Sequence, residues 1–271
     1  MSIQRCLLAA AGVVIAIAVS TSASAEALRL GGTGGATGML QYIAPLASRE
    51  FGTAVEVVPS LGSSGAIRAV ADGVIDIAVS GRKLKATEVA KGLKVRLMTR
   101  TPYVLVSSRF ADDGLKSSEI AKIYSDHDAK WSDGARVRII LRPKSDSDTA
   151  HLGQLFPAMS AAIANARSRP DVPIAATDQD NAAMAERMPG SLTGATLTQI
   201  MTEKRRLRRI PIDGIEPTFE NFEKGAYPFG KSFYVVTTAK PKDAVEKFVA
   251  FLRSPSGYQA LRHTGNLPVG E

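Results

Sequence analysis

The segment AVEVVPSLGSSGAIRAVADGVIDIAVS, residues 54–80, decides the fold that we expect for this chain of 271 residues. It predicts a strand at 54–58, a Gly/Ser loop at 62–65, a helix at 66–72 and a strand at 74–80. The last strand is almost wholly apolar, which is typical of a strand buried on both faces of a parallel sheet. Strand, loop, helix and strand in this order form the βαβ unit of an α/β fold.

The alternation of strands and helices continues on both sides of this segment. Loops rich in glycine and hydroxyl side chains stand repeatedly between a strand and the next helix. Open α/β sheets bind ligands at this place, where strands end and helix N-termini begin. Further strands are expected at 27–30, 103–107, 137–141 and 231–238, and further helices at 39–51, 117–124, 151–166, 242–252 and 256–262.

Composition and charge narrow the class of protein. Apolar residues make up 45% of the chain and aromatic residues 6%, which argues against a disordered chain or a fibre. The formal net charge is +8. The densest basic run, 204–209, has no interleaved aromatic residue, so we interpret it as a solvated face before a short strand at 210–212. We expect no nucleic-acid partner.

Signatures of enzymes are missing from the sequence. The three histidines are far apart and form no H-x-x-x-H pair, and no G-x-S-x-G elbow is present. The glycine run at 31–38 lacks the Lys-Ser/Thr ending of a P-loop. The single cysteine, Cys6, excludes an internal disulfide framework and a cysteine-rich zinc module. We therefore expect no catalytic residue, no metal ligand and no cofactor.

The first 25 residues have the three parts of a secretory signal. Arg5 gives a charged start, 7–19 is an apolar run, and Ala23-Ser24-Ala25 is an A-x-A exit. The run is shorter than the roughly 20 residues that a transmembrane helix needs. A retained N-terminal anchor is the alternative to cleavage. Export makes anionic solutes more natural partners of a basic chain than nucleic acid.

Seven polar residues and one carboxylate are the candidate ligand-binding residues. Hydroxyl groups and free backbone N–H groups at helix N-termini are donors that suit an anion, and the helix dipole adds positive charge there. Arg142 ends a predicted strand and could add a forked, bidentate contact. The same residue types are also ordinary caps and turn formers, which is the alternative for each one. The candidates are Thr37, Ser63, Ser64, Ser80, Arg142, Ser147, Asp148 and Thr149.

Several short motifs, in order along almost the whole exported chain, resemble the phosphate-type periplasmic solute-binding proteins of ABC importers. Each motif is weak alone, and their order and spacing are what carries the resemblance. They are Gly35-Ala36-Thr37, the segments 62–70 and 74–80, residues 123–124 with 131–134, the segment 142–149, residues 221–222 with 225–229, and the segments 248–257 and 265–269.

The resemblance implies a type II periplasmic binding protein fold. This fold has two α/β lobes, each a mainly parallel sheet flanked by helices, with a ligand cleft between them. Lobe 1 would be 26–102 plus 232–271, and lobe 2 would be 103–231. Carried over position by position, the phosphate contacts fall on Thr37, Ser63, Arg142, Ser147 and Thr149.

The function that the resemblance implies is capture of an oxyanion, phosphate first, by a periplasmic monomer that delivers it to an ABC permease in the inner membrane. Molybdate, sulfate or a phosphonate is an alternative ligand. The other alternative is an exported binding or sensor module of the same fold that binds no phosphate.

Two positions depart from the pattern of the phosphate binders. Where those proteins often carry an aspartate after the serine that corresponds to Ser80, this chain has Gly81. The glycine of their Ser-Gly-Thr loop is Asp148 here, and the loop is one residue longer. A carboxylate beside a bound anion costs affinity unless it meets a proton or a cation. Asp148 is therefore a candidate for the acceptor that is missing at position 81, and the alternatives are that it points to solvent or marks a pocket that no longer holds phosphate.

We predict that the exported protein is cleaved after Ala25, because Ala23-Ser24-Ala25 follows the apolar run. N-terminal sequencing of exported material should begin at Glu26. Material that begins at Met1 and remains in the membrane fraction would show that the segment is an anchor.

Overall fold

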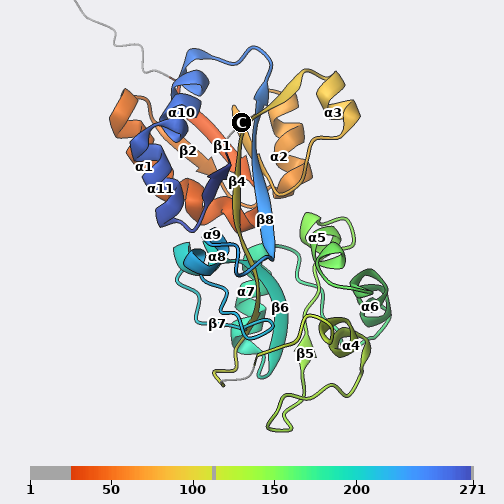
Figure 1. Cartoon of the computed structure of the whole chain (residues 1–271). Coiled ribbons are helices and arrows are strands. Elements are labelled where there is room, and N and C mark those ends of the chain that lie inside the picture. The colour runs from red at the N-terminus through yellow and green to blue at the C-terminus, as the bar shows by residue number, and fades with distance from the viewer. Residues whose placement is uncertain (1–25, 112–113, 270–271) are drawn as a thin grey trace, which may run out of the picture.

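The computed structural model describes residues 26–111 and 114–269, so the expected signal at 1–25 lies outside the described residues. Its elements form two groups, which we call the first and second lobes (Figure 1). The first lobe holds β1 (Leu28–Gly32), the 3-10 turn η1 (Gly34–Ala36), α1 (Thr37–Phe51), β2 (Val55–Val58), α2 (Gly62–Ala71), β3 (Ile77–Ser80), α3 (Ala86–Ala90), α10 (Asp243–Arg253), α11 (Pro255–His263) and β9 (Leu267–Val269).

The second lobe lies at the other end of two long strands, β4 (Leu93–Ser107) and β8 (Gly230–Thr238), which join the lobes (Figure 1). Helices α8 (Leu197–Thr202) and α9 (Phe219–Glu223) lie where the lobes meet. The remaining elements of the second lobe are α4 (Ile120–Ser125), β5 (Arg138–Ile139), α5 (Ser147–Leu155), α6 (Met159–Arg167), α7 (Asp178–Arg187), β6 (Ser191–Thr196) and β7 (Arg208–Arg209).

One hydrogen-bonded sheet runs through both lobes in the order β2-β1-β3-β8-β4-β6-β5. Strand β1 is parallel to β2 and β3, as the βαβ pattern predicts. Strand β8 is antiparallel to both β3 and β4. Its pairing with β4 extends from Leu93↔Thr238 to Pro102↔Gly230. The lobes are therefore joined by a continuous antiparallel pair of strands.

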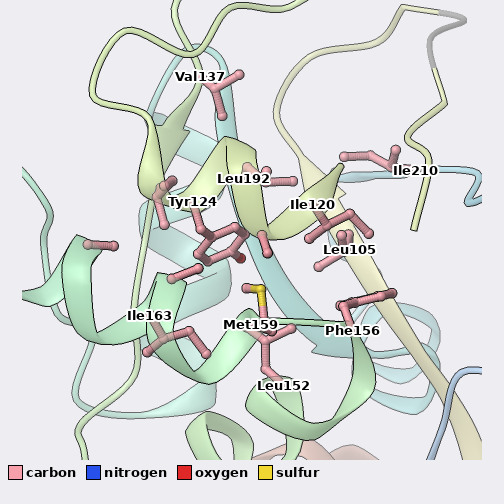
Figure 2. Packing of buried hydrophobic residues seen from close by; sticks show 14 of the residues in the cluster. Leu105, Ile120, Tyr124, Val137, Leu152, Phe156, Met159, Ile163, Leu192 and Ile210 are labelled. Carbon is pink, nitrogen blue, oxygen red and sulfur yellow. The ribbon is translucent and has the colours of Figure 1, made fainter. Parts of the chain in front are cut away.

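Each lobe closes a hydrophobic core of its own. Leu30 and Phe248 belong to the main buried cluster of the first lobe. Tyr124 is fully buried in the main cluster of the second lobe, with Met159 and Ile163 (Figure 2). Among the described residues, the buried members of these two clusters are different, and Leu267 of β9 packs against the cluster of the second lobe.

Some predicted elements have different limits in the structure. The predicted helix at 151–166 is two helices, α5 and α6, and Pro157 lies between them. Proline lacks the N–H that a continuous helix needs, and it disfavours helical backbone in the residue before it. The predicted strand at 74–80 begins only at Ile77, and Val74 is 52% exposed.

The sequence analysis also missed whole segments. The sequence predicted a strand only at 103–107, whereas β4 begins at Leu93. Residues 93–102 belong to this strand although they mix charged and apolar side chains. Helix α7 and strand β6 were not expected. The predicted loop at 62–65 is the first turn of α2, which Gly62 enters with a φ of +67° that suits glycine. Within the described ranges, no helix is long and apolar enough to cross a membrane.

Candidate functional site

A cavity of about 250 Å³ lies between the two lobes. The first lobe contributes the start of α2 and the turn after β3, and the second contributes the loop before α5 and the start of α7. Helices α2 and α5 lie at the facing ends of the lobes (Figure 1). The polar lining residues are Ser60, Ser63, Ser64 and Arg82 from the first lobe, and Arg142, Ser145, Asp146, Ser147, Thr177 and Asp178 from the second.

Two helix N-termini meet across this cavity. The hydroxyl oxygens of Ser63 in α2 and Ser147 in α5 are 3.2 Å apart. Ser63 also accepts a hydrogen bond of 2.9 Å from the backbone N–H of Gly81. The first turn of a helix has N–H groups without an intrahelical acceptor, and its dipole is positive at that end. Both sides of the cavity therefore present donors to the same small volume.

Arg142 is the cation in the second-lobe wall, and it is only 7% exposed. Its Nη1 donates to the carbonyl of Ala175 at 2.7 Å, and its Nη2 donates to Asp146 at 2.9 Å. Its buried Nε has no hydrogen-bond partner among the described residues. The guanidinium is therefore held in place by protein groups at both of its Nη atoms.

Arg82 forms the edge of the first-lobe wall. Its guanidinium donates to both carboxylate oxygens of Glu88, at 2.9 and 2.8 Å, and to the hydroxyl of Ser64 at 3.0 Å. The hydrogen bond from Arg82 lowers the pKa of Glu88 to about 2. This arginine is therefore oriented by a carboxylate that stays ionised at neutral pH.

A buried ion pair lies behind the cavity. Lys231 of β8 is 1% exposed, and its ammonium pairs with the buried carboxylate of Asp148. Burial lowers the pKa of Lys231 to about 7, and the negative charge of Asp146 favours the protonated form against that desolvation. A Cβ at Gly81 would lie 2.8 Å from Cε of Lys231 and 3.1 Å from Oγ of Ser147. The missing side chain at position 81 therefore makes room for this lysine.

The structure brings four of the candidate ligand residues into the cavity wall: Ser63, Ser64, Arg142 and Ser147. The other four lie behind it. Thr37 is buried at the start of α1. The hydroxyl of Ser80 donates to the carbonyl of Arg82 and accepts from its N–H.

Thr149 and Asp148 also make contacts within the protein. The hydroxyl of Thr149 donates to the carbonyls of Arg142 and Pro143, which shapes the loop that carries the arginine. The carboxylate of Asp148 is paired with Lys231. Ser80, Asp148 and Thr149 therefore hydrogen-bond or pair with other protein groups and act on the cavity wall through them. Because the carboxylate of Asp148 is paired with Lys231, it does not take the place of the acceptor that is missing at position 81.

Three residues in or behind the cavity wall were not predicted from the sequence: Lys231, Asp146 and Asp178. A signal for Lys231 was available, because it shares the buried face of β8 with Phe233 and Val235 in a period of two. A signal for Asp178 was the capping box formed by Thr177 and Asp180, which marks the start of α7. Nothing in the sequence showed that these side chains meet.

We predict that Asp148→Asn destabilises the protein by up to about 1.4 kcal/mol at pH 6, one pH unit below the pKa of Lys231, because it leaves the Lys231 ammonium buried without its counter-charge. The loss should shrink at pH 9. In the variant, the pKa of Lys231 in the folded protein falls further below its value in the unfolded chain. The loss of unfolding free energy is therefore present below the pKa that Lys231 has in the unmodified folded protein, and it disappears as pH rises through that value. Urea unfolding followed by circular dichroism at both pH values measures this.

The double variant Lys231→Met with Asp148→Leu is the control. Replacing both charges by apolar groups of similar volume should recover most of the lost stability. An equal loss at pH 6 and pH 9 in Asp148→Asn would show that the two side chains do not form a charged pair.

Comparison with known proteins gives the family and the fold. A family model described as a PBP superfamily domain matches residues 18–256. No curated protein matches the chain. The fold is shared with a solved structure from Clostridium perfringens, assigned as a phosphate ABC transporter substrate-binding protein with bound phosphate, at a TM-score of 0.76 and 16% identity over 90% of this chain and 100% of that one.

Two further structures have the same fold. An ABC-type phosphate transport receptor from Vibrio cholerae has a TM-score of 0.62 and 17% identity, over 89% of this chain and 99% of that chain. A periplasmic molybdate-binding protein from Azotobacter vinelandii has a TM-score of 0.58 and 13% identity, over 90% and 100%.

The two-lobed α/β fold expected from the sequence is confirmed by these structures and by the topology of the sheet. The family model covers far more than half of the chain. The resemblance drawn from the sequence motifs is thereby confirmed, and the chain belongs to the PBP superfamily.

Proposed function

We propose that this protein is exported and captures an inorganic oxyanion, phosphate first, between its lobes for delivery to an ABC importer. The observation that carries the proposal is the meeting of the α2 and α5 N-termini, with Ser63 and Ser147 3.2 Å apart beside Arg142. The fold shared with two phosphate-binding transport proteins and a molybdate-binding protein supports the oxyanion class.

The proposed binding mode uses donors from both lobes. The backbone N–H groups that open α2 and α5, the hydroxyl groups of Ser63 and Ser147, and the unpartnered Nε of Arg142 would share the oxygens of one tetrahedral anion. Each lobe alone supplies only part of this set. An anion that satisfies both would therefore favour the closed arrangement over an open one.

We propose that the lobes move as bodies composed of 26–102 with 232–271, and of 103–231. The boundaries fall within β4 and near the start of β8, the two strands that connect the separate cores. Hinge closure needs only a few backbone dihedral changes in such connections. A monomer with one cleft is sufficient for this function.

A panel of phosphate, arsenate, sulfate, molybdate and a phosphonate tests the proposal directly. A ligand that binds only the folded state stabilises it by mass action, and the melting temperature rises. At a ligand concentration one hundred times the Kd, the free energy of unfolding increases by roughly 2.7 kcal/mol. Phosphate should give the largest shift. The absence of a shift with any anion at millimolar concentration would remove the importer role and leave a binding module of another kind.

We predict that Ser63→Ala weakens phosphate binding about tenfold or more, because a hydrogen bond to a charged acceptor contributes roughly 1.5–3 kcal/mol. Isothermal titration calorimetry measures the change. Ser256→Ala, on the exposed surface of α11, is the matched control and should bind like the unmodified protein. If Ser63→Ala also bound normally, Ser63 would serve only the Gly81 turn and the packing of the lobes.

A further inference from the structure

The glycine run at 31–38 has a structural role that its sequence did not indicate. Its 3-10 turn η1 belongs to the first lobe, and side chains of the second lobe pack directly on the buried backbone of Gly34 and Gly35. A Cβ at Gly34 would lie 2.7 Å from Oε1 of Gln179, and a Cβ at Gly35 would lie 3.1 Å from Oγ1 of Thr196. The lack of side chains at these two positions therefore lets the lobes approach each other.

The same close approach continues into helix α1. A Cβ at Gly38 would overlap the hydroxyl of Thr202 in α8. The hydroxyl of Thr196, at the end of β6, donates to the carbonyl of Gly35 at 3.0 Å. Thr37, which the resemblance places on the phosphate, is buried at the start of α1 and is not among the residues that line the cavity. The glycine run is therefore a contact surface between the lobes.

Gln179 makes the most hydrogen bonds in this contact. It is the second residue of α7, in the second lobe. Its Oε1 accepts from the hydroxyl of Ser60 at 2.6 Å, and its Nε2 donates to the carbonyl of Gly34 at 3.0 Å. Nε2 also donates to Glu203 at 2.7 Å. One amide therefore binds two separate segments of the first lobe, while a carboxylate of its own lobe fixes the direction in which the amide points.

The backbone of Ser60 also indicates that this contact is specific. Ser60 lies in the loop between β2 and α2, and its φ of +45° is in the left-handed region that residues other than glycine rarely adopt. Such a conformation costs energy and persists where surrounding contacts compensate for it. The hydrogen bond to Gln179 is one such contact, and it exists only while the lobes are together.

These hydrogen bonds are made by protein groups alone. Ser60 and Gly34 line the cavity, and Gln179 directly follows a residue of its wall in α7. Across the same cavity, the hydroxyl groups of Ser63 and Ser147 are 3.2 Å apart. Because none of these contacts includes a ligand atom, they stabilise the closed arrangement whether or not an anion is bound.

We infer that the contact between the glycine run and Gln179 holds the lobes closed in the ligand-free protein, and that Gln179 is a positioning residue for anion capture. The closed ligand-free state is independent of the proposed function, and the effect on affinity rests on it. A ligand that binds only the closed form has an apparent Kd equal to its intrinsic Kd divided by the closed fraction. Loss of Gln179 should therefore weaken the binding of every anion by the same factor.

Small-angle X-ray scattering of the protein, dialysed free of oxyanions, measures whether the lobes are closed. The unmodified protein should give the same scattering profile with and without millimolar phosphate. Gln179→Ala should be expanded in the ligand-free solution and contract when phosphate is added. Gln154→Ala, at an exposed position of α5 in the same lobe, is the matched control and should behave like the unmodified protein.

Isothermal titration calorimetry with phosphate and arsenate measures the effect on affinity. Gln179→Ala should weaken both anions equally, by roughly three- to tenfold, because hydrogen bonds between neutral groups contribute modestly and only the closed fraction changes. Ser60→Ala should cause a smaller loss in the same direction. Added to Gln179→Ala, it should cause no further loss, because the hydrogen bond between the two side chains is already absent.

The outcomes separate this inference from the proposed function. If the unmodified protein is expanded without ligand and contracts with phosphate, the inference is wrong and the proposed function stands. If the ligand-free protein is closed and no anion binds, the closed state stands and the proposed function is wrong. If Gln179→Ala is as compact as the unmodified protein and binds both anions equally well, the positioning role of Gln179 is wrong. The scattering of the unmodified protein needs no variant, so it decides the matter even if Gln179→Ala fails to fold.

Discussion

The antiparallel pairing of β4 with β8 is the constraint on which the rest of the structure depends. These strands pair from Leu93↔Thr238 to Pro102↔Gly230 with one register shift between Val95 and Leu97, and β4 reaches from Leu97 against the first-lobe core to Tyr103 in the second-lobe core. Strand β8 also pairs with β3, whose last residue precedes Gly81. The register of three strands therefore sets which side chains face each other where the lobes meet.

Charge compensation is the second principle of the cleft. Arg82, Arg142 and Lys231 each have a carboxylate partner. The positive charge in and behind the cavity wall is therefore largely compensated by the protein itself. A ligand anion would add negative charge to a site that already holds several aspartates. Under this constraint, binding depends on neutral donors from helix N-termini and hydroxyl groups, and on where a proton can reside. The overall charge of +8 says little about such a site.

The sequence was sufficient to predict the type of fold and part of the cavity wall in each lobe. The apolar strand at 77–80 and the Gly/Ser segment at 62–65 have local signatures, and the structure places Ser63 and Ser64 in the cavity wall, in the first turn of α2 instead of the predicted loop. Residues 93–102 were missed because a strand that joins two lobes is partly exposed, so its apolar and charged residues do not alternate cleanly.

The electrostatic partners could not be predicted, because they depend on long-range contacts. Lys231 and Asp148 are far apart in the sequence, and only the path of β8 past α5 brings them together. Asp148 stands between two hydroxyl residues in the chain, which suggested a ligand contact, yet its carboxylate faces the lysine. Local sequence predicts where helices begin, and tertiary packing decides where their first side chains point.

A crystal structure of the protein grown with phosphate is the measurement that tests the central claim most directly. We predict a tetrahedral anion between the α2 and α5 N-termini, within hydrogen-bond distance of Ser63, Ser147 and the Arg142 guanidinium. Strong density for the anion at another place, or a closed cleft that contains only water from a solution in which phosphate binds, would contradict it.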